Sequence, residues 1–238
     1  MKDGMMANQH ADQDAIRSAM AELAENFVGS TDIDSILESV TSHAVELIGG
    51  VDVADVLLID GQRYRSMAAT DEIATRLDKL QIELHEGPCL DAAAENPVIL
   101  SPDLTSDLRW PNFAAAAVEE GVSSMMSFRL YSYAKQRNGV GGTAALNMLS
   151  RTRSDFSLED QAVGAMLATH AASALIAADR QTQFESALAS RDVLGQAKGI
   201  LMERFKVDAV EAFGLLVKLS QDSNTLVRTV AQRIVEST

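Results

Sequence analysis

The sequence holds a single cysteine, Cys89, among its 238 residues. One cysteine excludes an intrachain disulfide and any zinc site that needs several cysteines. No apolar run approaches the ~20 residues that a membrane-spanning helix needs. The N-terminal residues 1–14 also lack the apolar centre of a signal peptide. These absences predict a cytoplasmic protein with no membrane segment.

Positive charge is also scarce, because 20 Lys and Arg residues stand against 34 Asp and Glu residues, a net charge of −14. This balance argues against the broad basic surface of a protein that binds nucleic acid nonspecifically. Residues 184–238 carry equal numbers of basic and acidic side chains, so residues 1–183 carry the whole excess. We therefore expect an acidic body and an electrically balanced C-terminal segment, and the length favours two domains.

Hydrophobic periodicity predicts the elements of the acidic body. Residues 1–12 are polar and predict a disordered tail. Helical spacing follows at 14–27, at 36–48 and at 71–80, and after Pro111. Strand patterns cover 51–60, 63–70, 125–134 and 143–150, with a hairpin turn at Asp60-Gly61 and an irregular segment at 85–100. This order predicts an α+β fold with an antiparallel sheet flanked by helices.

A long helix is predicted from Ser157 onward. Ser157 and Asp160 have capping-box spacing. A heptad seam then continues for nearly four heptads, through Val163, Leu167, His170, Ala174, Ala177, Gln181, Phe184 and Leu188. We expect a helical linker at about 157–190 that forms a two-stranded, coiled-coil-like stalk in a homodimer. Before about residue 178 the seam fits packing on the chain's own sheet equally well.

Three short amphipathic helices are predicted in the C-terminal segment. The expected core positions are Val193, Leu194, Ala197, Ile200, Leu201, Phe205, Ala212, Phe213, Leu216, Leu219, Val227, Val230, Ala231, Ile234 and Val235. Asp208 with Glu211 predicts a capping box for the second helix, and Ser223 or Asn224 a cap for the third. Gly195 and Gly199 lie in the first helix, where each costs roughly 0.8–1 kcal/mol relative to alanine. Spacing alone favours a neighbouring helix of the same fold as the reason for them.

The C-terminal segment resembles the ANTAR domain, a three-helix RNA-binding module of bacterial transcription antitermination regulators. The residues that carry the resemblance are QAKGILM at 196–202, Ala212-Phe213, Leu216, Ser220-Gln221, Asn224, Arg228 and Ala231. The resemblance implies a dimer that binds paired RNA hairpins in nascent transcripts. Its implied RNA-binding residues are Gln196, Lys198, Gly199, Arg204, Asn224 and Arg228. The family commonly has a basic residue where this chain has Leu226, which removes one cation from the third helix.

The acidic body resembles a GAF domain of the kind found before ANTAR domains in actinobacterial regulators. The layout that carries the resemblance comprises the strand at 53–60, EGPCLDA at 86–92, Asp103-Leu104, RWP at 109–111, Gly121-Val122 and ALN at 145–147, followed by Phe156-Ser157. The resemblance implies a sensor domain at 13–180 that takes a small molecule or a redox signal, followed by an ANTAR domain at 181–238. Cys89 is a candidate redox sensor, although a single cysteine is more often a buried apolar residue. The sequence indicates no particular cofactor, and the spacing of His85, Glu86 and Cys89 is not that of a known metal site.

Three other classes of protein were compared with the GAF–ANTAR resemblance. A methionine sulfoxide reductase of the GAF type needs further cysteines to resolve a sulfenic acid, so no enzyme is expected. A DNA-binding helix-turn-helix would carry several cations on its recognition helix, and the third helix has only Arg228 and Arg233. A dimeric signalling or protein-interaction module that has lost RNA binding remains the alternative, and Leu226 is the residue that favours it.

Overall fold

The computed structural model describes residues 15–22, 32–60, 63–94, 96–133, 142–152 and 155–237. The predicted tail at 1–12 lies outside the described residues. The chain divides into two compact units, residues 1–178 and residues 179–238. Each unit is described separately.

The first unit contains a five-stranded antiparallel sheet in the order β2-β1-β5-β4-β3. The strands are β1 (Val53–Asp60), β2 (Arg63–Met67), β3 (Val98–Ser101), β4 (Ser124–Tyr133) and β5 (Gly142–Ser150). Asp60 lies opposite Arg63, so β1 and β2 pair as predicted, although residues 61–62 of the turn lie outside the described residues. β1, β5 and β4 are the three inner strands, and they position the buried cluster described below.

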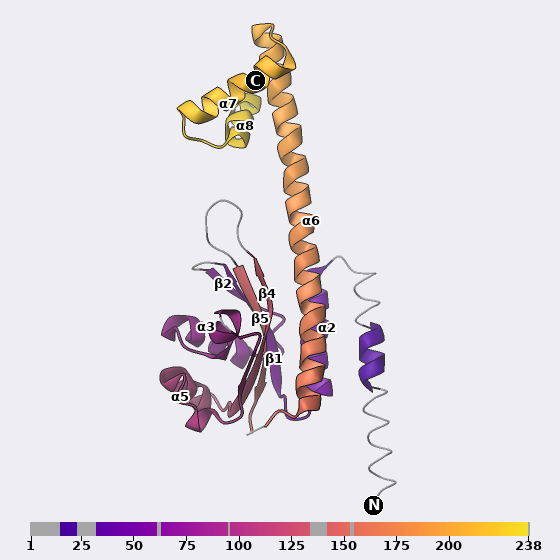
Figure 1. Ribbon diagram of the computed structural model, residues 1–238, viewed down its shortest axis with the longest axis vertical. Coiled ribbons are helices and arrows are strands. Elements are labelled where there is room, and N and C mark those ends of the chain that lie inside the picture. Colours follow the sequence, from indigo (N-terminus) through magenta and orange to yellow (C-terminus); the bar gives the residue numbers. More distant parts are fainter. Residues whose placement is uncertain are drawn as a thin grey trace, which may run out of the picture. The chain divides into compact units, whose positions relative to one another are not determined.

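Helices cover both faces of the sheet (Figure 1). α2 (Ile33–Leu47) and α6 (Leu158–Phe205) lie on one face, and α3 (Glu72–Leu84) and α5 (Pro111–Glu119) lie on the other. β1 alternates between the two layers: Ala54 and Val56 belong to the core under α2 and α6, and Val53 to the core under α3 and α5. The predicted α+β fold with a flanked antiparallel sheet is confirmed.

The segment predicted to be irregular, 85–100, is not irregular. It contains α4 (Pro88–Ala94) and most of β3, which pairs with β4. α4 is only seven residues long and begins at a proline, which is a favoured first helical residue. Two helical turns are too short to show a hydrophobic period, which is why the sequence pattern missed this helix.

α6 begins with the predicted capping box. The Asp160 amide donates to Ser157 Oγ at 3.2 Å, and the Ser157 amide donates to Asp160 Oδ2 at 2.8 Å. Val163 and Leu167 are buried in the core under α2 and α6, so the early part of the heptad seam packs on the chain's own sheet. At Gly164 an added Cβ would lie 2.6 Å from the Phe128 ring, so the glycine permits close contact between helix and sheet.

α6 also contains an 18-residue window that is apolar enough by composition to cross a membrane, with a mean hydropathy of 1.3. The buried apolar residues of α6, such as Val163, Leu167 and Ala171, pack against the sheet. That packing accounts for the apolar composition in the way expected for the core helix of a globular domain.

The second unit combines the end of α6 with α7 (Ala209–Asp222) and α8 (Val227–Glu236). The prediction of a separate first helix is wrong, because α6 continues without a break to Phe205. Residues 178–192 contain neither glycine nor proline, so nothing in that stretch interrupts the helix. The buried core of the unit consists of Ala197, Leu201, Ala212, Leu216, Val230 and Ala231.

The capping box of α7 is confirmed, because Asp208 accepts from the Glu211 amide and Glu211 accepts from the Asp208 amide. The predicted burial of Phe205, Phe213 and Leu219 is wrong, since these side chains are 58%, 45% and 46% exposed. A unit of three short helical segments has too little interior to cover every apolar residue. The predicted cap of α8 is also wrong: the N-cap is Leu226 without a side-chain hydrogen bond, and Asn224 lies in the preceding turn with a φ of 46°.

Candidate nucleic-acid interface and buried polar cluster

A surface hollow of about 540 Å³ lies in the second unit between α6 and the end of α8. α6 contributes residues 196, 199, 200 and 203, whose spacing places them on one helical face, and α8 contributes Val235. Arg204 completes the lining. We call this feature the α6–α8 hollow, and its lining residues are Gln196, Gly199, Ile200, Glu203, Arg204 and Val235. Three of the six residues predicted to bind RNA, Gln196, Gly199 and Arg204, thus lie together.

The other three predicted RNA-binding residues lie elsewhere in the unit. Lys198 is half-buried and does not line the hollow. Arg228 donates from Nη1 to Ser186 Oγ at 3.2 Å, and Ser186 is roughly 15 Å along α6 from Gln196 at 1.5 Å per residue. Asn224 is exposed in the turn between α7 and α8. The structure therefore spreads the predicted residues over several places, and their roles in RNA binding remain predictions.

The two unusual glycines of α6 leave open space. No heavy atom lies within 4 Å of the position that a Cβ would take at Gly195 or Gly199. The interpretation that these glycines admit a neighbouring helix of the same unit is therefore wrong. Their backbone is bare at the surface, and Gly199 forms part of the α6–α8 hollow.

The charges around the hollow have mixed signs. Glu203 accepts from Lys206 Nζ at 3.0 Å, and both side chains are largely exposed. Ile200, Glu203 and Val235 were not predicted as site residues. The position of Glu203 follows from the spacing of Gln196 and Gly199, seven and four residues earlier, which was a usable signal. Val235 comes from α8, and no pattern in the sequence places it beside Gly199.

A cluster of polar side chains lies buried in the first unit between the sheet and α3. Asp55 on β1 pairs with Asn147 on β5, which pairs in turn with Ser127 on β4. Asn147 Nδ2 donates to Asp55 Oδ2 at 3.3 Å, and Ser127 Oγ donates to Asn147 Oδ1 at 2.9 Å. All three side chains are at most 1% exposed. Sequence reasoning missed this cluster, although an aspartate inside the apolar run VDVADVLL was a signal for it.

Asp78 of α3 brings a second carboxyl group to the same cluster. Ser66 Oγ donates to Asp78 Oδ2 at 2.6 Å, and Asn147 Nδ2 reaches Asp78 Oδ1 at 3.4 Å. Burial raises the pKa of Asp78 to about 6. Burial, reinforced by the Asp78 charge, raises the pKa of Asp55 well above its usual range. Two buried carboxyl groups that share one amide donor are stable only when at least one is protonated.

Cys89 at the start of α4 lies against this cluster and is fully buried. Burial, together with the Asp78 and Asp55 carboxylates, raises the pKa of the Cys89 thiol well above its usual range. The Cys89 amide donates a hydrogen bond to the buried Gln81 Oε1 at 2.9 Å. A thiol with a raised pKa is a weak nucleophile, so oxidation of Cys89 requires that α4 first exposes it.

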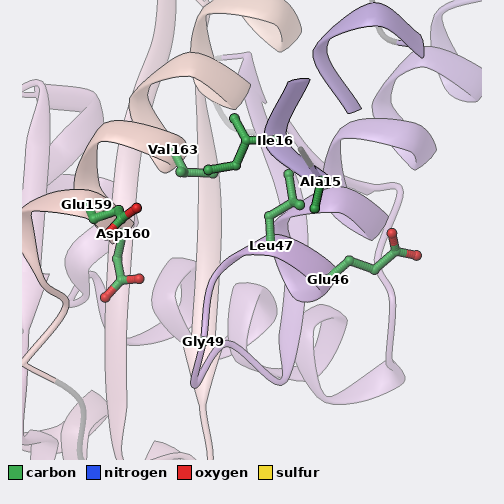
Figure 2. Close-up of a pocket in the computed structure, with 8 residues that line it drawn as sticks. All are labelled: Ala15, Ile16, Glu46, Leu47, Gly49, Glu159, Asp160 and Val163. Carbon is green, nitrogen blue, oxygen red and sulfur yellow. The ribbon is translucent and has the colours of Figure 1, made fainter. Parts of the chain in front are cut away.

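A second hollow, of about 330 Å³, lies in the first unit where residues 15–16, the end of α2 and the start of α6 meet (Figure 2). Ile16, Leu47 and Val163 give it an apolar side, and Glu46, Glu159 and Asp160 give it carboxylates. In Figure 2 the carboxylate of Glu46 points away from the other two. Among the residues that the structure describes, no group of three His, Cys, Asp or Glu side chains is arranged to hold a metal ion.

Comparisons with protein families agree with this division of the chain. The family model of the GAF domain matches residues 30–176, and the family model of the ANTAR domain matches residues 182–235. The GAF match covers more than half of the chain, so the chain belongs to the GAF family. With an ANTAR domain after it, the chain has the GAF–ANTAR architecture that its sequence resembles, and that resemblance is confirmed. The actinobacterial subtype stays a prediction.

Similar solved structures show the same fold over the first unit. A GAF domain of a phosphoenolpyruvate-protein phosphotransferase from Coxiella burnetii has 15% identity and a TM-score of 0.52, covering 72% of this chain and 96% of that one. Its counterpart from Acinetobacter has 17% identity and a TM-score of 0.50, covering 73% and 98%. An N-acylhomoserine lactone dependent LuxR family transcription factor from Burkholderia cenocepacia has 15% identity and a TM-score of 0.53, covering 71% and 98%. At these identities the likeness shows the fold alone, and no curated protein matches the chain.

The two matched families define the class of the protein. A GAF domain followed by an ANTAR domain is the architecture of a signal-sensing regulator that carries an RNA-binding antitermination domain. Both families are regulatory rather than catalytic.

Proposed function

We propose that this protein is a cytoplasmic, dimeric regulator whose ANTAR domain binds paired hairpins in nascent RNA and so prevents a terminator from forming. The observation that carries the proposal is the coincidence of the ANTAR match, residues 182–235, with the surface that leaves Gln196, Gly199 and Arg204 around one hollow. Balanced charge in this unit suits recognition of unpaired loop bases, which depends on stacking and hydrogen bonds more than on net charge. The protein has no catalytic activity in this proposal.

The proposed signal is received by the GAF domain as a small molecule or a redox change. The buried cluster of Asp55, Asp78, Asn147 and Cys89 is the proposed receiving element, because its packed polar groups respond to any change in charge or hydrogen bonding. If Cys89 senses oxidants, Cys89→Ser abolishes the dependence of RNA binding on oxidant. Unchanged oxidant dependence in that variant rejects a redox role for Cys89.

The proposed homodimer forms along the later part of the heptad seam. Phe184 and Leu188 occupy seam positions on α6 and are 61% and 44% exposed. Apolar residues at heptad spacing are covered by a second helix in a coiled coil. A dimer would carry two ANTAR domains, which matches an RNA target made of two hairpins.

Crosslinking the full-length protein to cellular RNA, followed by sequencing of the bound sites, tests the function. Recovery of paired short hairpins near terminators is the expected result. In gel-shift titrations with a recovered hairpin pair, Lys198→Ala should abolish binding, while Lys218→Ala, an exposed lysine of α7, serves as the matched control. Affinity should fall as salt rises, because phosphate contacts release counterions. Enrichment of no RNA contradicts the proposal.

A dimeric signalling module without RNA binding is the second candidate. It is favoured by Leu226, which is 70% exposed where related domains commonly have a basic residue, and by Val210, which is 80% exposed. Exposed apolar side chains of this size are typical of protein contacts. A dimer that binds no hairpin RNA in the crosslinking experiment supports this candidate.

A further inference from the structure

The α6–α8 hollow is open to solvent, and its volume is that of a small-ligand site. Its volume of about 540 Å³ lies within the range of roughly 300–1,000 Å³ that is usual for ligand pockets. Gly199 contributes no side chain, and no heavy atom lies within 4 Å of its Cβ position. A flat group can therefore approach the helix backbone at this point, which any larger residue would prevent.

The walls of the hollow combine apolar and hydrogen-bonding groups. Ile200 and Val235 are half-buried and offer apolar contact to the face of a ring. The Gln196 amide can donate and accept, while the Glu203 carboxylate can only accept. Arg204 lies beside them and forms no ion pair with any described residue in the unit.

The Glu203 carboxylate supplies the acceptor that would select the base. Its Oε1 accepts from Lys206 Nζ at 3.0 Å, and its Oε2 accepts no hydrogen bond from any described residue. Carboxylates accept hydrogen bonds from exocyclic amino groups, such as N4 of cytosine, and glutamine pairs with the N6 and N7 edge of adenine. Uracil lacks an amino group, and its N3–H lies between two carbonyl oxygens that the carboxylate repels.

We infer that the α6–α8 hollow binds one unstacked nucleobase of an RNA loop, and that this base carries an exocyclic amino group. The inference rests on the proposed RNA-binding function and adds a site and a base preference to it. Gln196 and Glu203 contact the edge of the base, Ile200 and Val235 contact its face, and Arg204 binds the flanking phosphate.

The probe for the test is a synthetic RNA of two hairpins with randomised loops, selected on the full-length protein. Each loop base of the selected RNA is then replaced by uracil, and the Kd values are compared. We expect one loop position at which uracil weakens binding by roughly tenfold. In Glu203→Ala, the ratio of the Kd with uracil to the Kd with the selected base should fall to about one. Glu185→Ala removes the same charge from an exposed site outside the hollow and should preserve the penalty.

The outcomes separate the inference from the function on which it rests. Selection of no RNA overturns both. If an RNA is selected but uracil is tolerated at every one of its loop positions, the inference is overturned and the function stays intact. If the loss of affinity caused by uracil is unchanged in Glu203→Ala, the inference is also overturned, because residues other than Glu203 then contact the base. The ratio of two Kd values is the readout, so a general gain in affinity from the lost negative charge does not affect it.

Discussion

Replacing Gly199 by alanine should have opposite effects on stability and on RNA binding. Gly199 lies inside α6, is exposed, and has no heavy atom within 4 Å of its Cβ position. Alanine is favoured over glycine by about 0.8–1 kcal/mol in a helix interior, and here no clash reduces that gain. Gly199→Ala should therefore stabilise the second unit.

The expected magnitude is large enough to measure. The second unit comprises residues 179–238, and a gain of 1 kcal/mol raises the Tm of a domain of this size by roughly 4–8 °C where it unfolds on its own. The same methyl group occupies the bare backbone that the base is inferred to approach. We therefore expect hairpin affinity to fall by roughly tenfold, the loss of one base contact.

Thermal unfolding followed by circular dichroism and hairpin binding followed by fluorescence anisotropy measure the two effects. Gly214→Ala is the matched control, because Gly214 is exposed inside α7 with the same open space but does not line the hollow. It should raise the Tm to a similar extent without loss of affinity. If Gly199→Ala is destabilising, the space at Gly199 is not open; if it is stabilising and binds RNA as tightly as the wild type, nothing approaches the backbone there.

Three further predictions concern other parts of the chain. Because the folded pKa values of Asp78, about 6, and of Asp55 both exceed the unfolded value, the first unit should lose stability as pH rises from about 4 through 6; urea unfolding at several pH values should show this loss, and Asp78→Asn should reduce it. Gly87→Ala should destabilise the first unit by roughly 1–3 kcal/mol in the same assay, because Gly87 has a φ of 142° and an added Cβ would clash with Gln81. The control Gly49→Ala should be close to neutral, because its added Cβ would meet no atom within 4 Å. Phe184→Glu should convert the proposed dimer to a monomer in analytical ultracentrifugation while Val210→Glu does not, and a dimeric Phe184→Glu variant would rule out the seam as the interface.

The elements with strong local signals were predictable from the sequence. The apolar run VDVADVLLID, which ends at the Asp60-Gly61 turn, predicted β1, and two capping boxes, Ser157 with Asp160 and Asp208 with Glu211, predicted where α6 and α7 begin. These signals depend on neighbours within four residues, so no knowledge of the fold was needed. α4 was missed because its seven residues give no period. A separate first helix was wrongly expected in the C-terminal segment, where α6 continues to Phe205.

The sites depend on contacts between distant residues and were less predictable. Gln196, Gly199 and Arg204 were named from the family resemblance, but the hollow that joins them needs Val235 from another helix. Asp55 and Asp78 were not named at all, since acidic residues are almost never fully buried unless paired. Their pairing depends on how α3 crosses β1, and the spacing of residues in the chain does not show that crossing.

The glycines of α6 are of two kinds, and a mutational screen would separate them. Gly164 is in contact with the Phe128 ring, so larger residues there should be lost in any screen for folded, abundant protein. Gly195 and Gly199 meet no atom of the chain, so larger residues there should survive that screen and even be enriched. Selection for abundance and selection for antitermination should therefore rank substitutions at Gly199 in opposite orders, and a protein evolved only for thermal resistance would be expected to lose this glycine early.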